Sequence, residues 1–344
     1  MKNGKKLLET LDQRILVPPP LWMMRQAGRY LPEYREARTK AGSFWKLCIT
    51  PTLAAEITLQ PVRRFGFDAA IIFSDILVVP VALGVPVDFQ DGTGPTFSQI
   101  ASAAELHPDV EDWGGVFEPV YEALRITRKG LDASTALLGF AGGPWTLASY
   151  LAAGRGGDEQ KAAKLWAYRD PAGFSNLVDI LTACVSQHLI GQLSAGADAV
   201  QLFDSWASGL PPDAFARWVV EPTRKIVANV RRAVPQARII GFPRAATLKG
   251  YELYARETGV DAISLDTAAP MDWAAATLGS HVVLQGNLDP VALVAGGRAL
   301  AEAVDRILRA TRGVPFIFNL GHGILPETPV EHVEEMIRLV RSGR

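Results

Sequence analysis

Short apolar runs that end in polar or glycine residues recur along this chain, and the segments between them carry apolar residues at helical spacing. Such runs are typical of strands buried on both faces of a parallel sheet. Eight stand out, at residues 20–24, 69–73, 136–140, 199–203, 238–242, 262–265, 281–284 and 315–318. Eight strand–helix units predict a (β/α)8 barrel, although a doubly wound open sheet with a second domain would show the same alternation.

The residues that follow these runs favour the barrel. They are mostly polar: Arg25, Gln26, Arg29, Ser74, Asp75, Asp204, Ser205, Arg244, Asp266, Gln285, Asn287, Asn319 and His322. Polar side chains at the carboxyl ends of many strands indicate a barrel active site. A barrel takes about 250 residues, so roughly a hundred of the 344 are left over for the long early connections. We therefore expect one α/β domain over residues 1–344, a (β/α)8 TIM barrel with insertions in the early strand–helix connections.

Two local signals refine this picture. Residues 85–100, around an Asp-Gly-Thr-Gly sequence, predict a hairpin excursion. Near the end of the chain, Thr328 is suited to be a helix N-cap, with Pro329 at the first helical position and Glu331 completing a capping box. The last helix is therefore expected to begin at Pro329.

Composition narrows the class of protein. A formal net charge of −1 argues against a nucleic-acid or membrane-surface binder, because both need a sustained basic field. Cys48 and Cys184 are the only cysteines and lie far apart, which favours a reducing cytosol over a disulfide scaffold. The apolar stretch 69–87 contains Asp75 and is broken by proline and glycine, so we expect a strand and loop, and not a membrane span. These features predict a soluble, cytoplasmic protein.

The densest cluster of candidate functional residues follows the first run. Arg25 and Arg29 are four residues apart, so on a helical turn both would face the same way. Arginine suits planar, bidentate binding of carboxylates or phosphates, and two at a strand end suggest a polyanionic substrate. The alternative is a solvated helix face on which Glu33 and Glu36 pair with the arginines.

The sequence PPPLWMMRQAGRYLPEY at 18–34 resembles the amino-terminal signature of the uroporphyrinogen decarboxylase family. GFAGGPWT at 139–146 resembles its second signature. Asp75 in FSDI, Asp204-Ser205 and NLGHG at 319–323 match further family segments in the expected order. The resemblance extends from about residue 5 to about residue 340 and implies a (β/α)8 barrel, a homodimer, and decarboxylation of the four acetate groups of uroporphyrinogen without metal or organic cofactor.

By this resemblance, Asp75 accepts hydrogen bonds from pyrrole N–H groups and offsets the charge of a cationic intermediate. Arg25 and Arg29 clamp substrate carboxylates, and one of the two takes part in proton transfer. Tyr150 hydrogen-bonds a substrate acetate. The implied substrate-binding set is Arg25, Gln26, Ala27, Gly28, Arg29, Asp75, Tyr150, Ser205 and His322. Without the resemblance, an aspartate at a strand end is as often a turn residue, and a lone serine, tyrosine or histidine is more often structural.

Two other functions fit parts of the pattern. A zinc-dependent methyltransferase of the same broad family needs thiolate and imidazole ligands close together, which two separated cysteines do not provide. A non-catalytic protein that binds tetrapyrroles or other anions would use the same arginines, but the intact set of Arg25, Arg29, Asp75, Tyr150 and His322 favours the enzyme.

Overall fold

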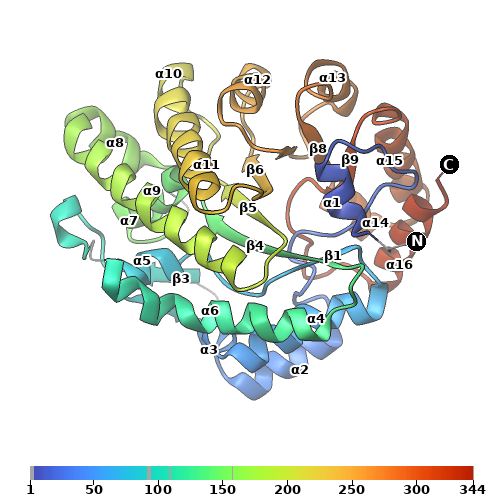
Figure 1. The fold of residues 1–344 in the computed structure, drawn as a ribbon, viewed down its shortest axis with the longest axis horizontal. Helices are drawn as coiled ribbons and strands as arrows, with labels where there is room; N and C mark the ends of the chain where they lie inside the picture. The colour runs from blue at the N-terminus through green and yellow to red at the C-terminus, as the bar shows by residue number, and fades with distance from the viewer. Residues whose placement is uncertain (1–3, 91–93, 108–109, 157, 344) are drawn as a thin grey trace.

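The computed structural model describes residues 4–90, 94–107, 110–156 and 158–343. Its main sheet is parallel and has the strand order β1-β4-β5-β6-β7-β8-β9. These strands span Ala69–Ile71, Ala136–Gly142, Ala199–Asp204, Ile239–Pro243, Ala262–Ser264, Val283–Leu288 and Phe316–Leu320. Seven of the eight predicted runs are thus strands of one sheet, which curls so that helices surround it (Figure 1).

The first predicted run, 20–24, is extended but is not a strand of this sheet. Leu21 forms a single parallel bridge to Phe318 of β9. On the other side the backbone N–H of Asp68 donates to the carbonyl of Leu21 at 3.0 Å. Three consecutive prolines at 18–20 have no N–H to donate, which shortens any ladder that this segment can form. Among the described residues, the main sheet therefore has seven strands and one bridged segment in place of the eight strands predicted.

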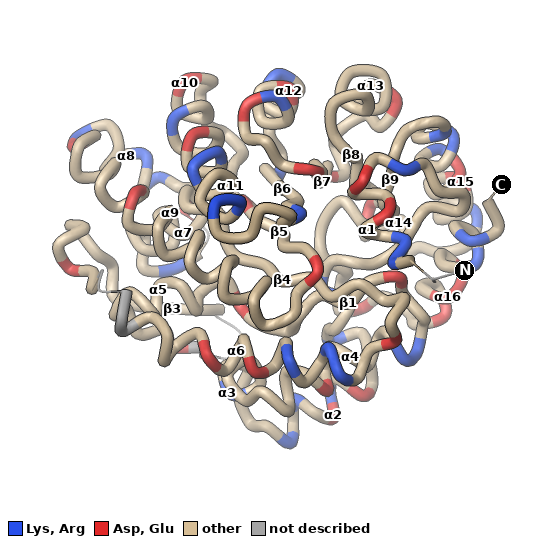
Figure 2. Tube along the Cα trace, viewed as in Figure 1, with Lys and Arg blue, Asp and Glu red and all other residues tan. Residues whose placement is uncertain are grey.

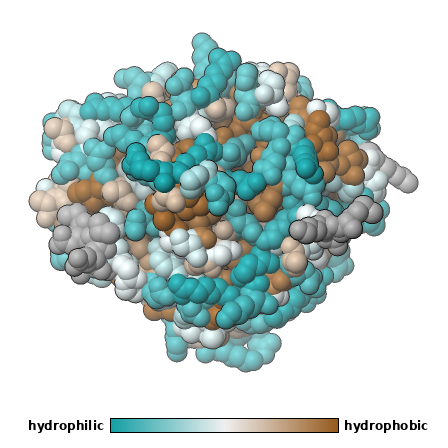
Figure 3. All heavy atoms as spheres, viewed as in Figure 1, coloured by the Kyte–Doolittle hydropathy of each residue, from teal (hydrophilic) through white to brown (hydrophobic). Residues whose placement is uncertain are grey.

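The helices form the outer layer (Figure 1). They are α1 Lys6–Leu11, α2 Pro32–Ala41, α3 Phe44–Ile49, α4 Pro51–Phe65, α5 Val78–Ala82, α6 Val110–Gly130, α7 Pro144–Ala153, α8 Lys161–Arg169, α9 Pro171–Ser194, α10 Pro212–Phe215, α11 Glu221–Ala233, α12 Leu248–Glu257, α13 Met271–Thr277, α14 Pro290–Ala295, α15 Gly297–Ala310 and α16 Val330–Arg341, with short 3-10 and π segments at Ala103–Glu105 and Ala216–Val220. Lys and Arg alternate with Asp and Glu along them (Figure 2), and the visible face mixes polar and apolar side chains (Figure 3). Such a surface agrees with the near-zero net charge.

The early connections hold the extra elements, as predicted. Between the 20–24 segment and β1 lie three helices, α2 to α4. Between β1 and β4 lies an antiparallel hairpin of β2 (Val87–Gln90) and β3 (Gly94–Phe97), and its turn falls outside the described residues. The hairpin predicted within 85–100 is therefore confirmed.

The predicted start of the last helix is wrong. Helix α16 begins at Val330 with Pro329 as its N-cap, and no side chain caps it. Thr328 is buried, and its N–H donates to Leu325 one turn earlier, so it belongs to the preceding turn. The helix therefore begins one residue later than the capping-box pattern predicts.

The small helix α1 determines which end of the sheet is open to a ligand. Its Leu7 and Leu11 are buried in one apolar cluster with the first residues of several strands, among them Ala69, Ala136 and Ala199. These residues mark the amino-terminal end of the sheet, so α1 covers that end. The carboxyl-terminal end is where the predicted site residues lie.

Candidate functional site

The loop that carries Arg25 is held by the residue next to it. The buried Gln26 accepts a hydrogen bond from Met23 N at 3.1 Å and donates one to the carbonyl of Ala69 at 3.1 Å. Arg25 itself has a left-handed backbone with φ of 59°, a conformation that costs energy outside glycine and gathers at functional sites. The Gln26 side chain thus helps to hold the framework of this loop.

The predicted helical turn linking the two arginines is also absent. Residues 22–31 form turns and bends, because the left-handed Arg25 interrupts any helix until α2 begins at Pro32. Both arginine residues are exposed. The acids expected to pair with them are taken by others: Glu33 binds Arg64 at 2.8 Å and Glu36 binds Lys40 at 2.6 Å. A solvated face built from those pairs is therefore not the arrangement found.

Asp75 follows β1 and is partly exposed. Its Oδ1 accepts the N–H of Leu77 at 2.9 Å, so the expected turn role is real. Burial raises the pKa of Asp75 to about 6, against the opposing effects of this hydrogen bond and of the Arg25 guanidinium. The hydroxyl of Ser74 just before it is buried and has no partner in the described structure. The ionised form of Asp75 is thus destabilised by burial and partly stabilised by the charge of Arg25.

Tyr150 lies on α7 and stacks on Trp206, with ring centroids 4.0 Å apart and planes inclined by 25°. The ring of Phe97, in the β2–β3 hairpin, also packs against Tyr150, with the two ring centroids 6.1 Å apart. Burial raises the pKa of Tyr150 to about 12, Asp75 adds to the rise and Arg25 opposes it. The phenol therefore stays protonated near neutral pH and can donate a hydrogen bond.

A buried carboxylate connects Tyr150 to the end of β5. Asp204 Oδ1 accepts from Thr146 N at 3.1 Å and from the Thr146 hydroxyl at 2.5 Å. That hydroxyl in turn accepts from Trp206 N at 3.2 Å. Gly143 leaves room for the group, since a Cβ there would lie 2.5 Å from Asp204 Oδ2. Because Thr146 is one helical turn before Tyr150 on α7, this link fixes both the helix and the stacked Trp206.

His322 lies in the loop after β9, close to the Arg25 loop. A Cβ at Gly323 would lie 2.4 Å from Arg25 Cδ, so glycine is needed for this approach. Burial, together with the charges of Arg244 and Arg25, lowers the pKa of His322 to about 4, against the opposing effect of Asp266. The imidazole is therefore neutral near pH 7 and has one N–H to donate.

The structure brings four of the predicted residues into one electrostatic environment. The charge of Arg25 acts on the pKa values of Asp75, Tyr150 and His322. Arg29, by contrast, acts on Tyr34. The four residues that share this environment follow four different apolar runs, as expected for a site at the carboxyl edge of a parallel sheet. They are Arg25, Asp75, Tyr150 and His322.

The remaining predicted site residues are partly exposed small residues. Ala27 and Gly28 are partly exposed in the Arg25 loop, and a Cβ at Gly28 would lie 2.8 Å from the carbonyl of Arg25. Ser205 is partly exposed, and its carbonyl accepts from Arg244 Nη1 at 3.4 Å. Arg244 and Trp206 were not predicted as site residues. Their position after strand runs was a usable signal, but no recognised motif contains them.

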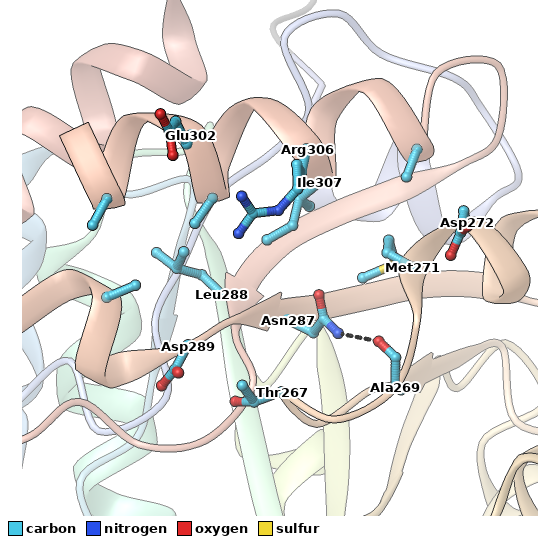
Figure 4. A pocket seen from close by; sticks show the side chains of 14 residues that line it. Thr267, Ala269, Met271, Asp272, Asn287, Leu288, Asp289, Glu302, Arg306 and Ile307 are labelled. Atoms are coloured by element: carbon cyan, nitrogen blue, oxygen red, sulfur yellow. Dashed lines mark hydrogen bonds between the residues drawn. The ribbon is translucent and has the colours of Figure 1, made fainter.

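A pocket of about 710 Å³ is lined by residues of α13, α14, α15 and the end of β8, and by none of the predicted site residues. Figure 4 shows the Arg306 guanidinium pointing toward Leu288, and Asn287 bonded to the carbonyl of Ala269. Within the described residues, no group of three or more His, Cys, Asp or Glu is placed to hold a metal ion. No helix in the same part of the chain is long and apolar enough to cross a membrane.

Comparison with known proteins identifies what the chain is similar to. A family model described as uroporphyrinogen decarboxylase matches residues 2–343. Proteins named uroporphyrinogen decarboxylase from Chelativorans sp. (strain BNC1) and Brucella anthropi are 53% and 52% identical over 340 residues, with 99% of each chain covered.

Among solved structures, a methyltransferase from Methanosarcina mazei superposes with a TM-score of 0.81 at 19% identity, covering 99% of this chain and 98% of that one. A B12-independent methionine synthase from Shewanella gives a TM-score of 0.55 at 12% identity over 85% of this chain and 86% of that one. At these identities the likeness concerns the fold alone.

Proposed function

Since the chain belongs to the uroporphyrinogen decarboxylase family, we propose that its substrate binds at the carboxyl ends of the strands, where Arg25, Asp75, Tyr150 and His322 lie. The chain is a carboxy-lyase of porphyrin and heme biosynthesis. It removes the four acetate carboxyl groups of uroporphyrinogen III as CO2 and yields coproporphyrinogen III.

Each decarboxylation replaces a carboxylate by a proton, so that R–CH2–COO− and H+ give R–CH3 and CO2. A pyrrole protonated at a ring carbon is a cation that can accept the electron pair released when the C–C bond to CO2 breaks. The substrate thus supplies the electron sink that an organic cofactor supplies in other decarboxylases. The protein has to bind the carboxylates, place a proton donor and stabilise the cationic ring.

The observation that carries the proposal is the environment of Asp75. Its carboxylate is mostly ionised near neutral pH although burial raises its pKa to about 6. A cationic pyrrole next to it would compensate this charge, and its N–H groups would donate to the carboxylate. Asp75 therefore stabilises the cationic pyrrole of the intermediate more than the neutral pyrrole of the substrate, which is the condition for lowering the barrier.

The other residues bind and orient the substrate. Arg25 and Arg29 are guanidinium donors for carboxylates, and the neutral His322 and Tyr150 are additional donors. The proposed substrate-contacting set comprises Arg25, Gln26, Ala27, Gly28, Arg29, Asp75, Tyr150, Ser205 and His322. Asp75, Arg25, Arg29 and Tyr150 are the proposed catalytic residues.

The fold proposal is a closed (β/α)8 barrel in one domain over residues 1–344, with the 20–24 segment as its eighth member. Support comes from the hydrogen bonds of that segment on both sides, to β9 and to Asp68. Hydrogen exchange provides the test: the amides of Asp68 and Phe318 should be protected as strongly as those of β5. Fast exchange at both positions would contradict closure.

The assembly proposal is a homodimer in the cytoplasm, as the family resemblance implies. Two buried free thiols, Cys48 and Cys184, are compatible with a reducing compartment. Sedimentation should give twice the 37.2 kDa chain mass, and cell fractionation should recover the protein with cytoplasmic markers. A chain that sediments at its own mass at micromolar concentration would contradict the dimer.

The experiment that tests the function uses pure protein treated with a chelator and dialysed. It is incubated without oxygen and in the dark with uroporphyrinogen, and the oxidised products are resolved by carboxyl count. We expect hepta- to tetracarboxylic products without added metal or cofactor. Persistence of the octacarboxylic substrate would refute the function, whereas activity that returns only with zinc would favour the methyltransferase-type chemistry.

A further inference from the structure

Arg244 stands on a rigid backbone at the end of β6. Its N–H donates to the carbonyls of Asp204, at 3.1 Å, and Phe242, at 3.0 Å. The next residue, Ala245, has a left-handed backbone with φ of 57°, and its N–H donates to Asp266 Oδ2 at 2.7 Å. These bonds use the backbone only, so the position of Arg244 does not depend on its side chain.

The guanidinium of Arg244, in contrast, has little to bind within the protein. Its one hydrogen bond in the described structure is the 3.4 Å contact from Nη1 to the carbonyl of Ser205, which is long for such a bond. No carboxylate within the described residues lies in ion-pair distance of it, whereas Arg231 pairs with Asp261 at 2.8 Å. A guanidinium has five N–H donors, so most of those on Arg244 are open to a ligand.

The nearby acid does not neutralise Arg244. Asp266 is buried, and both its oxygens are engaged: Oδ2 accepts from Ala245 N and the Tyr251 hydroxyl, and Oδ1 accepts from Ala268 N at 2.7 Å. The charge of Arg244 instead reaches His322, whose pKa it lowers together with Arg25. Arg244 therefore faces the same site as the predicted residues.

The strand order places Arg244 and Arg25 on opposite sides of that site. Between the 20–24 segment and β6 lie β1, β4 and β5 in one direction, and β7, β8 and β9 in the other. Arg25 follows the segment, and Arg244 follows β6. A macrocycle with carboxylates around its whole rim needs cationic groups on both sides of the site, and Arg25 lies on one side only.

We propose that Arg244 is a substrate-binding residue that holds a carboxylate of the tetrapyrrole on the side of the site opposite Arg25. The inference rests on the proposed substrate site. Because the backbone of Arg244 is held and its guanidinium has no ion-pair partner among the described residues, it forms a charge-assisted pair without first breaking another. Its contact is with the rim and not with the reacting ring, so it contributes to binding of substrate and transition state equally.

The test compares Arg244→Gln and Arg244→Lys with the matched control Arg306→Gln. Arg306 is exposed on α15 and is not in the proposed substrate-contacting set, so its replacement removes the same charge from another element. Two readouts are needed: steady-state decarboxylation of uroporphyrinogen, and equilibrium binding of oxidised uroporphyrin followed by quenching of tryptophan fluorescence. The second does not depend on turnover.

We expect Arg244→Gln to raise both KM and the uroporphyrin Kd by roughly 10- to 100-fold, with kcat within about threefold of the parent. The lysine variant should lie between, and Arg306→Gln should match the parent. Unchanged KM and Kd in Arg244→Gln, or an equal rise in the control, would overturn the inference while leaving the proposed function intact. If the parent protein shows no turnover but Arg244→Gln still binds uroporphyrin more weakly than the parent, the result would support the anion site at Arg244 and refute the function.

Discussion

Replacing Asp75 by asparagine should lower activity and raise stability at the same time. Asparagine keeps the size of the side chain, and its amide oxygen can still accept the N–H of Leu77, a bond of 2.9 Å in the parent. What the substitution removes is the negative charge. The two effects follow from this one loss because the charge is costly in the free protein and useful only against a cationic intermediate.

The magnitudes follow from the site. Burial raises the pKa of Asp75 from 3.8 to about 6. A rise of this size corresponds to about 3 kcal/mol against the ionised fold at neutral pH, and solvent at the partly exposed side chain brings the value nearer to about 1–2 kcal/mol. In turnover, a charge pair about 4 Å apart is worth about 4 kcal/mol at an effective dielectric constant of 20, or about a 1000-fold loss in kcat.

The assay measures both quantities on the same preparation. Thermal unfolding at pH 7.5 gives stability, and anaerobic decarboxylation with products resolved by carboxyl count gives kcat and KM. The control is Asp289→Asn, since Asp289 accepts the N–H of Val291 two residues on at 2.8 Å, the same local geometry outside the site. This control should keep parental turnover.

Two results would refute the reasoning on Asp75. Turnover of Asp75→Asn within about tenfold of the parent would show that its charge does not stabilise the transition state. A clear loss of stability, together with lost turnover, would show that Asp75 is a structural turn residue whose carboxylate the fold requires.

Three further predictions concern the framework. Burial raises the pKa of Asp204 to about 7, against the effect of its hydrogen bonds from Thr146, so its contribution to stability is full below about pH 4 and is lost as pH rises through 7. Between pH 5 and pH 8, the melting temperature of Asp204→Asn should therefore rise relative to that of the parent. A difference in melting temperature that stays constant over this range would contradict the raised pKa. Thr146→Val removes the donor to Asp204 and the acceptor for Trp206, so it should cost about 1–3 kcal/mol of unfolding free energy and lower kcat, with Thr146→Ser restoring both; equal behaviour of the two variants would exclude the hydroxyl. Leu7→Ala opens a cavity at the covered end of the sheet and should cost about 2–5 kcal/mol in urea unfolding with KM unchanged, whereas a raised KM would place α1 near the substrate.

The sequence by itself determined the strands and the residue types of the site. Seven of eight apolar runs became strands of one parallel sheet, because burial on both faces demands continuous apolar stretches that are visible locally. The polar residues after those runs, including Asp75 and His322, lie at the carboxyl edge because parallel strands all end there. The family signatures were readable for the same reason, since they are contiguous.

Only the tertiary structure decided how those residues act. The engaged side chain of Gln26 depends on Ala69, which is distant in sequence, and no helical spacing rule predicts this bond or the left-handed backbone of Arg25. The lowered pKa of His322 likewise depends first on burial and then on Arg244, a residue that only the curling of the sheet brings near. Local patterns report burial and residue type, whereas pairing, conformation and protonation are set by neighbours that the chain places far apart.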